Sequence, residues 1–109
     1  MAYDDGLATR VRELVADRPG LTEKRMFGGL AFMINGNMAC GVHGDELIVR
    51  LAADASEAAL AEPATRPFDM TGRPMKGWIL VGAGGHAEDG DLRRWVERGV
   101  GYAQTLPPK

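Results

Sequence analysis

Residues 24–51 read KRMFGGLAFMINGNMACGVHGDELIVRL and contain the signals of two consecutive β-hairpins. The first turn is Asn35-Gly36, which suits a type I′ turn because both central residues must take positive φ values. The second is Gly44-Asp45, which suits a type II′ turn with glycine in the first position. The helices on either side of this stretch are expected to cover one face of the hairpins.

Two-residue loops at both turns would determine the register of the strands. Across the first turn, the expected pairs are Ile34–Asn37, Phe32–Ala39 and Leu30–Gly41. Across the second turn, the expected pairs are His43–Glu46, Val42–Leu47 and Cys40–Val49. A register error of one residue would move every side chain of the affected strand to the opposite face.

Alternation along these strands predicts one fully apolar face and one mixed face. The apolar core face comprises Met33, Met38, Cys40, Val42, Leu47, Val49 and Leu51. The mixed face combines Leu30, Phe32, Ile34 and Ile48 with Asn37, His43, Glu46 and Arg50. A solvated face would not need that many large apolar residues. Two interpretations of Leu30, Phe32, Ile34 and Ile48 stay open: a partner-binding surface, or a second core layer covered by later parts of the chain.

The rest of the chain predicts an α+β fold. Helices are expected at about residues 5–17, 54–62 and 91–103, and further strands at 21–27 and 78–81, the latter paired with a short strand at 68–70. The predicted architecture is a two-layer sandwich with a mostly antiparallel sheet of about five to six strands and three helices, in the order α-β-β-β-β-α-β(-β)-α. Residues 1–109 are expected to form a single domain.

Composition sets limits on the class of protein. The formal net charge is −2, so there is no general positive field for binding nucleic acid. One cysteine allows neither an intrachain disulfide nor a cysteine-rich zinc site. The start of the chain lacks the pattern of a signal peptide, and no apolar run approaches the roughly 20 residues that span a bilayer. The expected location is the cytoplasm.

Three segments resemble the N-terminal domain of the TfoX/Sxy family. They are MFGGLAFMINGNMACGV at 26–42, FDMTGRPMKGW at 68–78 and LPPK at 106–109. The resemblance implies a fold similar to secretion chaperones and a role like that of bacterial competence regulators, which act with the cyclic-AMP receptor protein as noncatalytic coactivators. The full-length regulators also carry a C-terminal helical domain, so this domain alone is expected to retain only part of that role.

No residue pattern predicts an active site. Cys40 and His43 could form a nucleophile and its base, but the register places them on opposite faces. His43, Asp45, Glu46 and His86 lack the spacing of a metal site, and His86 is expected in a solvated turn. Gly82 to Gly85 lacks phosphate-loop spacing and predicts a flexible connection. Neither a cofactor, a metal ion nor catalysis is expected.

One basic cluster lies near aromatic residues. Arg66, Arg73 and Lys76, beside Trp78, could contact an anion or nucleic acid. The alternative is a hairpin whose charges are solvated and whose tryptophan is core. The leading hypothesis is a noncatalytic protein-interaction domain that acts as a competence-type transcriptional coregulator. A cyclic-AMP-receptor-like transcription factor and a second copy of the chain are its expected partners. The alternative hypothesis is a nucleic-acid-binding domain that uses the basic cluster.

Overall fold

One antiparallel sheet organises the computed structural model, which describes residues 3–26, 28–68 and 76–108. Its six strands follow the order β1-β2-β3-β4-β6-β5. They are β1 (Leu21–Met26), β2 (Gly29–Ile34), β3 (Asn37–His43), β4 (Glu46–Arg50), β5 (Thr65–Pro67) and β6 (Trp78–Val81). The helices are α1 (Asp5–Val15), the 3₁₀ turn η1 (Ala53–Ala55), α2 (Ser56–Leu60), α3 (Ala83–His86) and α4 (Asp89–Gln104). The predicted α+β class and the order of its elements are confirmed.

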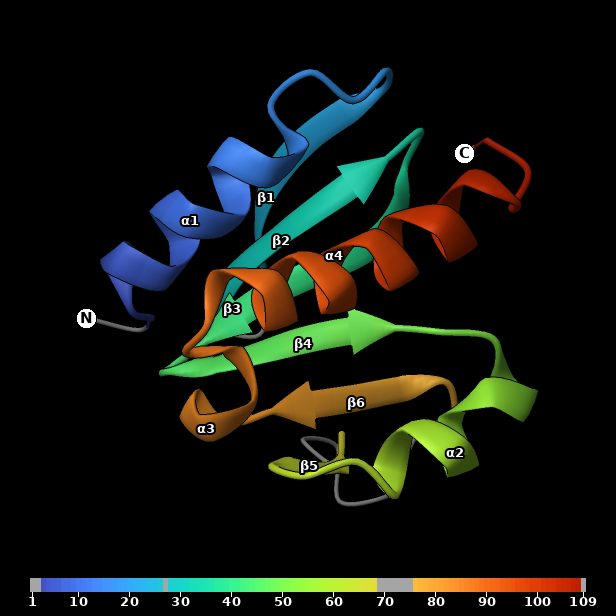
Figure 1. Ribbon diagram of the computed structural model, residues 1–109. Coiled ribbons are helices and arrows are strands. Elements are labelled where there is room, and N and C mark those ends of the chain that lie inside the picture. The colour runs from blue at the N-terminus through green and yellow to red at the C-terminus, as the bar shows by residue number, and fades with distance from the viewer. Residues whose placement is uncertain (1–2, 27, 69–75, 109) are drawn as a thin grey trace.

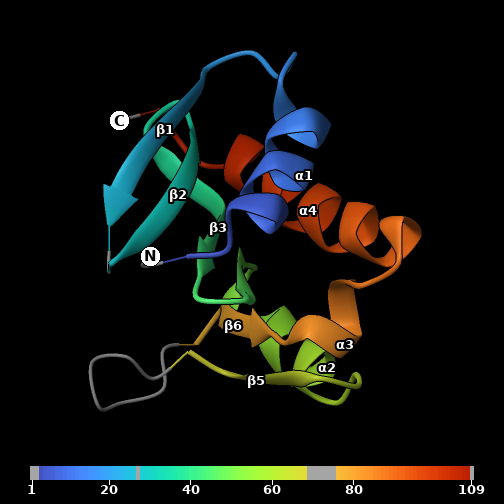
Figure 2. The ribbon, with the colours of Figure 1, turned by 90° about the vertical axis from the view of Figure 1, so that its left-hand side faces the viewer.

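Helices α1 and α4 lie on the same face of the sheet (Figure 1 and Figure 2). Helix α4 packs over β3 and β4, while α2 and α3 lie at the β5–β6 end. The Asp4 carboxylate caps α1 by accepting the backbone N–H of Leu7 at 3.1 Å. Apolar side chains from α1, α4 and the inner sheet face form the main core. We call this inner face the helix-covered face and the opposite one the second face.

The first hairpin contains a β-bulge that the sequence analysis did not predict. Ile34 pairs with Asn37 as expected, but Phe32 pairs with Cys40 and Leu30 with Val42. The predicted pairs Phe32–Ala39 and Leu30–Gly41 are therefore wrong, because Ala39 is an additional residue on β3. In the second hairpin, the three predicted pairs are all present.

The bulge changes which side chains of β2 face the helices. Leu30, Phe32 and Ile34 join the main core beneath α1 and α4 instead of forming part of a mixed face. Met33 and Met38, which were predicted in the core beneath the helices, belong to the cluster on the second face. The assignments of Cys40, Val42, Leu47, Val49 and Leu51 to the helix-covered face are confirmed.

A smaller apolar cluster lies on the second face. Its buried members are Ala31, Met38, Ile48, Phe68 and Leu80, with Met26, Met33 and Trp78 packed against them. Ile48 is thus separated by the sheet from Leu30, Phe32 and Ile34, although the sequence analysis grouped all four. All four are buried within the chain, so the structure supports the interpretation of these residues as core.

The segment between β6 and α4 differs from the predicted flexible loop. It contains the short helix α3, and α4 begins at Asp89 instead of about residue 91. His86 is buried, not solvated, and its Nε2 lies 2.8 Å from the backbone oxygen of Asp45. The strand β5 lies at Thr65–Pro67, ahead of the predicted 68–70, and residues 69–70 are outside the described part. No helix in the described part is long and apolar enough to cross a membrane.

Candidate functional site

The single cysteine is enclosed by the main core. Cys40 has no exposed surface, and burial raises the pKa of its thiol to about 12. A thiol with that pKa is almost wholly protonated near neutral pH, so it is a poor nucleophile. His43 extends from the opposite face of β3 and pairs with Glu46 across the turn. The two residues therefore do not form a nucleophile–base pair in this fold.

Three of the four residues considered as metal ligands take part in other contacts. Asp45 contacts His86 through its backbone oxygen, not its carboxylate. Glu46 instead accepts two hydrogen bonds from Arg66. Within residues 3–26, 28–68 and 76–108, no three His, Cys, Asp or Glu side chains are grouped to hold a metal ion.

The predicted basic cluster is divided by the fold. The guanidinium of Arg66 binds the carboxylate of Glu46 through Nε at 2.8 Å and Nη2 at 2.6 Å. Glu46 and Arg50 are the first and last residues of β4, so this ion pair lies about 13 Å along the strand from Arg50. Arg73 falls outside the described residues. The Arg66 guanidinium, which is bound to Glu46, thus lies at the opposite end of β4 from Arg50, the residue that pairs with Trp78.

Trp78 belongs to a different arrangement. Arg50 pairs with Trp78 across β4 and β6, and its Cζ atom lies 5.0 Å from the centroid of the Trp78 ring. The same Cζ lies 5.7 Å from the ring centroid of Tyr102 in the last turns of α4. Phe68 supports the indole from the second face, with ring centroids 5.9 Å apart. We call Arg50, Trp78 and Tyr102 the arginine–aromatic cluster.

A second basic residue, Lys76, is close to this cluster along the chain. The backbone oxygen of Gly77 accepts the N–H of Leu51 at 2.6 Å, which connects the end of β4 to the segment that precedes β6. Lys76 is the adjacent residue and is exposed. The backbone of Lys76 therefore lies near the same end of β4 as Arg50. Of the predicted basic cluster, Lys76 lies two residues before Trp78 in the chain, while the cation that contacts the indole ring is Arg50.

The sequence pattern does not identify Arg50 and Tyr102 as members of the site. Arg50 belongs to the predicted mixed sheet face, and Tyr102 lies within the helix predicted at about residues 91–103. The sequence feature that pointed to this site was the presence of basic residues close to the aromatic residue Trp78. That signal could identify Trp78, but only the pairing of β4 with β6 brings Arg50 beside it.

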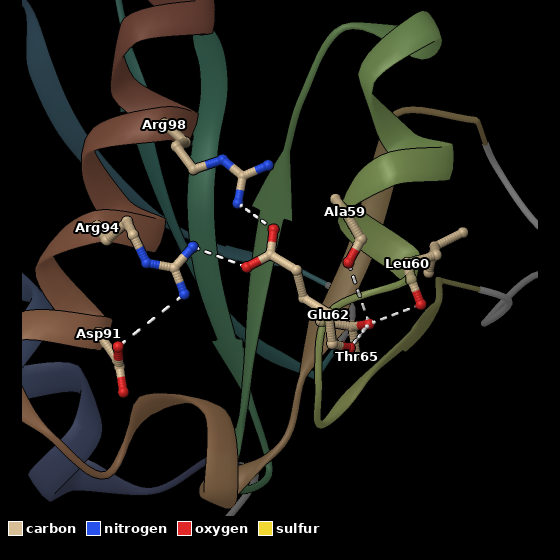
Figure 3. Close-up of polar contacts among 7 residues, drawn as sticks. All are labelled: Ala59, Leu60, Glu62, Thr65, Asp91, Arg94 and Arg98. Atoms are coloured by element: carbon tan, nitrogen blue, oxygen red, sulfur yellow. Dashed lines mark hydrogen bonds and ion pairs between the residues drawn. The ribbon is translucent and has the colours of Figure 1, made fainter.

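A second cluster of charged residues fixes α4 to the turn after α2 (Figure 3). The Glu62 carboxylate accepts Nη1 of Arg94 at 2.7 Å and Nη1 of Arg98 at 2.8 Å. Both guanidiniums also lie over the Trp95 ring, at 5.1 Å for Arg94 and 4.4 Å for Arg98. The Thr65 hydroxyl lies within 3.2 Å of three backbone oxygens in the last turn of α2 and the turn after it, and the shortest distance, 2.7 Å, is to the oxygen of Glu62; the other two belong to Ala59 and Leu60. The charged side chains of Glu62, Arg94 and Arg98 are paired with one another, which indicates a structural role for this cluster.

Glu62→Gln is expected to lower the free energy of unfolding by about 1 kcal/mol at neutral pH. Burial raises the pKa of Glu62, but hydrogen bonds from Arg98 and Arg94 and their charges outweigh it and hold the pKa below its usual value. A lowered folded-state pKa stabilises the protein above the unfolded-state pKa, and this stabilisation is lost as the pH falls through the folded-state value. The difference between wild type and variant should therefore shrink below about pH 4.5.

Urea denaturation over a pH series would measure this effect. Glu57→Gln is the matched control, because Glu57 is an exposed acid on α2 with no ion pair in the described part. It should change stability little at any pH. An effect of Glu62→Gln that persists unchanged at low pH would contradict the ion-pair explanation.

Comparison with known proteins gives one match. The protein-family model described as the TfoX N-terminal domain matches residues 13–103, which is most of the chain. Neither the curated proteins nor the solved structures gave a match. The matched range contains the two hairpins, the arginine–aromatic cluster and the Glu62 cluster.

Proposed function

The chain belongs to the TfoX N-terminal domain family, and we propose that it is a noncatalytic protein-interaction domain. It acts in the cytoplasm as a transcriptional coregulator of the competence type. Its partner is a transcription factor similar to the cyclic-AMP receptor protein. The observation that carries this proposal is the family match over residues 13–103.

The described surface supports binding more than catalysis. The only thiol is buried, with its pKa raised to about 12, and His43 lies across the sheet from it. The arginine–aromatic cluster, by contrast, combines the three residue types that dominate the binding energy of protein interfaces: arginine, tryptophan and tyrosine. All three of its side chains are half-buried, so part of each is accessible to a partner.

The test combines a binding measurement with a measurement in cells. The purified chain is mixed with the purified cyclic-AMP-receptor-type regulator of the same cell and analysed by gel filtration, with the chain alone as reference for self-association. We expect the two proteins to co-elute. In cells, deletion of the gene is expected to lower the transcripts of genes that depend on this regulator. Separate elution together with unchanged transcripts would overturn the proposed function.

A nucleic-acid-binding domain is the second candidate. Its support is the contact of Arg50 with the Trp78 and Tyr102 rings and the exposed Lys76 two residues before Trp78. Bases stack on aromatic side chains, and phosphates bind cations. Against it stand the net charge of −2 and the ion pair of Arg66 with Glu46. We therefore place protein interaction first.

A further inference from the structure

We propose that the arginine–aromatic cluster, together with Lys76, is the docking site for an acidic segment of a partner protein. This inference rests on the proposed function and adds the location of the surface and the chemistry of the partner. It starts from the unusual state of Arg50 among the arginines of the chain.

Arg50 is a half-buried cation without an anion. In the described part of the chain, three other arginines are half-buried, and each forms an ion pair: Arg10 with Asp89, Arg18 with Glu97 and Arg98 with Glu62. The side chain of Arg50 makes no hydrogen bond or ion pair with any of these described residues, only its two ring contacts. Partly desolvated cations are usually paired, so an external anion would complete this site.

The two rings prepare Arg50 for such an anion. Contacts with Trp78 and Tyr102 restrict the guanidinium, which lowers the conformational entropy that binding would otherwise cost. Ring contacts do not use the N–H groups as conventional donors, and none of the described residues accepts a hydrogen bond from the Arg50 side chain. A carboxylate matches the planar fork of a guanidinium with two parallel hydrogen bonds. Lys76 is exposed, and the adjacent Gly77 is hydrogen-bonded to Leu51, so its side chain offers a second positive charge for a neighbouring acid.

The number and kind of charged and aromatic groups at this site favour a protein segment over nucleic acid as the ligand. Binding to a nucleic-acid backbone depends on many phosphate contacts, whereas this site offers two cations in the described part of the chain. The net charge of −2 would repel a long polyanion. One or two carboxylates flanked by apolar side chains fit the pair of cations and the exposed parts of the two rings.

The test uses three defined probes on the full chain. They are a short peptide in which Asp alternates with Leu and Phe, the same peptide with Asn in place of Asp, and single-stranded oligothymidylate. Binding is followed by the indole N–H signal of Trp78 in proton–nitrogen correlation spectra, assigned with Trp78→Phe. We expect the acidic peptide to shift this signal in a saturable manner, and the Asn peptide to bind at least about tenfold more weakly, since charged hydrogen bonds are lost.

Four variants test the residues. Arg50→Gln should weaken binding of the acidic peptide about 10- to 100-fold, and Arg50→Lys, which keeps the charge without the planar fork, should give an intermediate loss. Lys76→Gln should cost about two- to fivefold. Arg93→Gln is the control: Arg93 is exposed on α4, has no ion pair in the described part and carries the same charge, so its removal should leave affinity nearly unchanged.

Each other result overturns the docking site. Equal binding by Arg50→Gln and wild type, an equal loss in Arg93→Gln, or an unmoved Trp78 signal would place the interaction elsewhere or make it nonspecific. Tighter binding of oligothymidylate than of the acidic peptide would assign the cluster to nucleic acid. Circular dichroism checks folding; if Arg50→Gln is unfolded, Arg50→Lys and Lys76→Gln decide the question.

The outcomes separate this inference from the proposed function. Co-elution with the regulator that survives Arg50→Lys and Lys76→Gln, with no peptide binding, would retain the function and reject the docking site. Peptide binding at the cluster, with no regulator binding and unchanged transcripts, would retain the docking site and reject the coregulator role.

Discussion

Phe32→Asp is expected to unfold the domain. Phe32 is 1% exposed and lies on the helix-covered face, paired with Cys40 of β3. Asp at this position would leave a cavity and an unpaired carboxylate in the core, with a combined cost of about 5 kcal/mol or more. That cost is comparable to the whole stability of a small domain. Circular dichroism and urea denaturation at neutral pH should show loss of the cooperative transition.

A conservative control separates the charge from the packing. Phe32→Leu keeps the site apolar and should cost about 1 kcal/mol with the fold intact. A Phe32→Asp variant that unfolds cooperatively near the wild-type urea midpoint would contradict the structure. Such a result would put Phe32 on an exposed surface and restore the predicted mixed face as a candidate for partner binding.

The hairpins show which part of a sheet can be predicted from local sequence. Turn chemistry is local, so Asn35-Gly36 and Gly44-Asp45 correctly predict where the chain reverses and how the residues next to each turn pair. The bulge at Ala39 has no such signal, since the residue is neither glycine nor a turn former. A single additional residue was enough to move Leu30, Phe32 and Ile34 to the other face.

A sequence pattern can group only those residues of the candidate site that are neighbours in the chain. Lys76 and Trp78 are two residues apart, so a local sequence pattern is enough to group them. Arg50 and Tyr102 reach Trp78 through the pairing of β4 with β6 and the path of α4 across the sheet. Those are tertiary relationships between distant segments, and a sequence pattern does not contain them.

The burial of His86 in the segment after β6 also depends on a contact between distant parts of the chain. Its glycines and acids predicted a flexible, solvated connection containing His86. In the structure, the ring of His86 is buried against the backbone oxygen of Asp45 in the β3–β4 turn. The local composition indicated a loop, but the contact of His86 with the distant β3–β4 turn determines that its ring is buried.

Helix α4 can approach the sheet closely because residue 99 is glycine. A Cβ atom at Gly99 would overlap the backbone oxygen of Ala39 and lie 3.2 Å from its carbonyl carbon. Ala39 is also the additional residue of the bulge, so the irregular point of β3 lies directly beneath the helix. The bulge and Gly99 therefore form one packing contact between sheet and helix.

Gly99→Ala is expected to lower the free energy of unfolding by about 2–4 kcal/mol, because backbone must move to admit the methyl group. Gly101→Ala provides an opposite control on the same helix. A Cβ there meets nothing within 4 Å, so the higher helix propensity of alanine should stabilise the protein by about 0.5–1 kcal/mol.

Thermal and urea denaturation of both variants would measure the contrast. For a domain of this size, 1 kcal/mol corresponds to about 4–8 °C in Tm, so the two midpoints should move in opposite directions and differ by about 10 °C or more. Stabilisation by both substitutions would mean that α4 does not pack against the bulge. Because Tyr102 lies on the same helix as Gly99, a displaced α4 would also move Tyr102 away from Arg50. Gly99→Ala should therefore weaken binding of the acidic peptide in protein that is still folded, whereas Gly101→Ala should leave it unchanged.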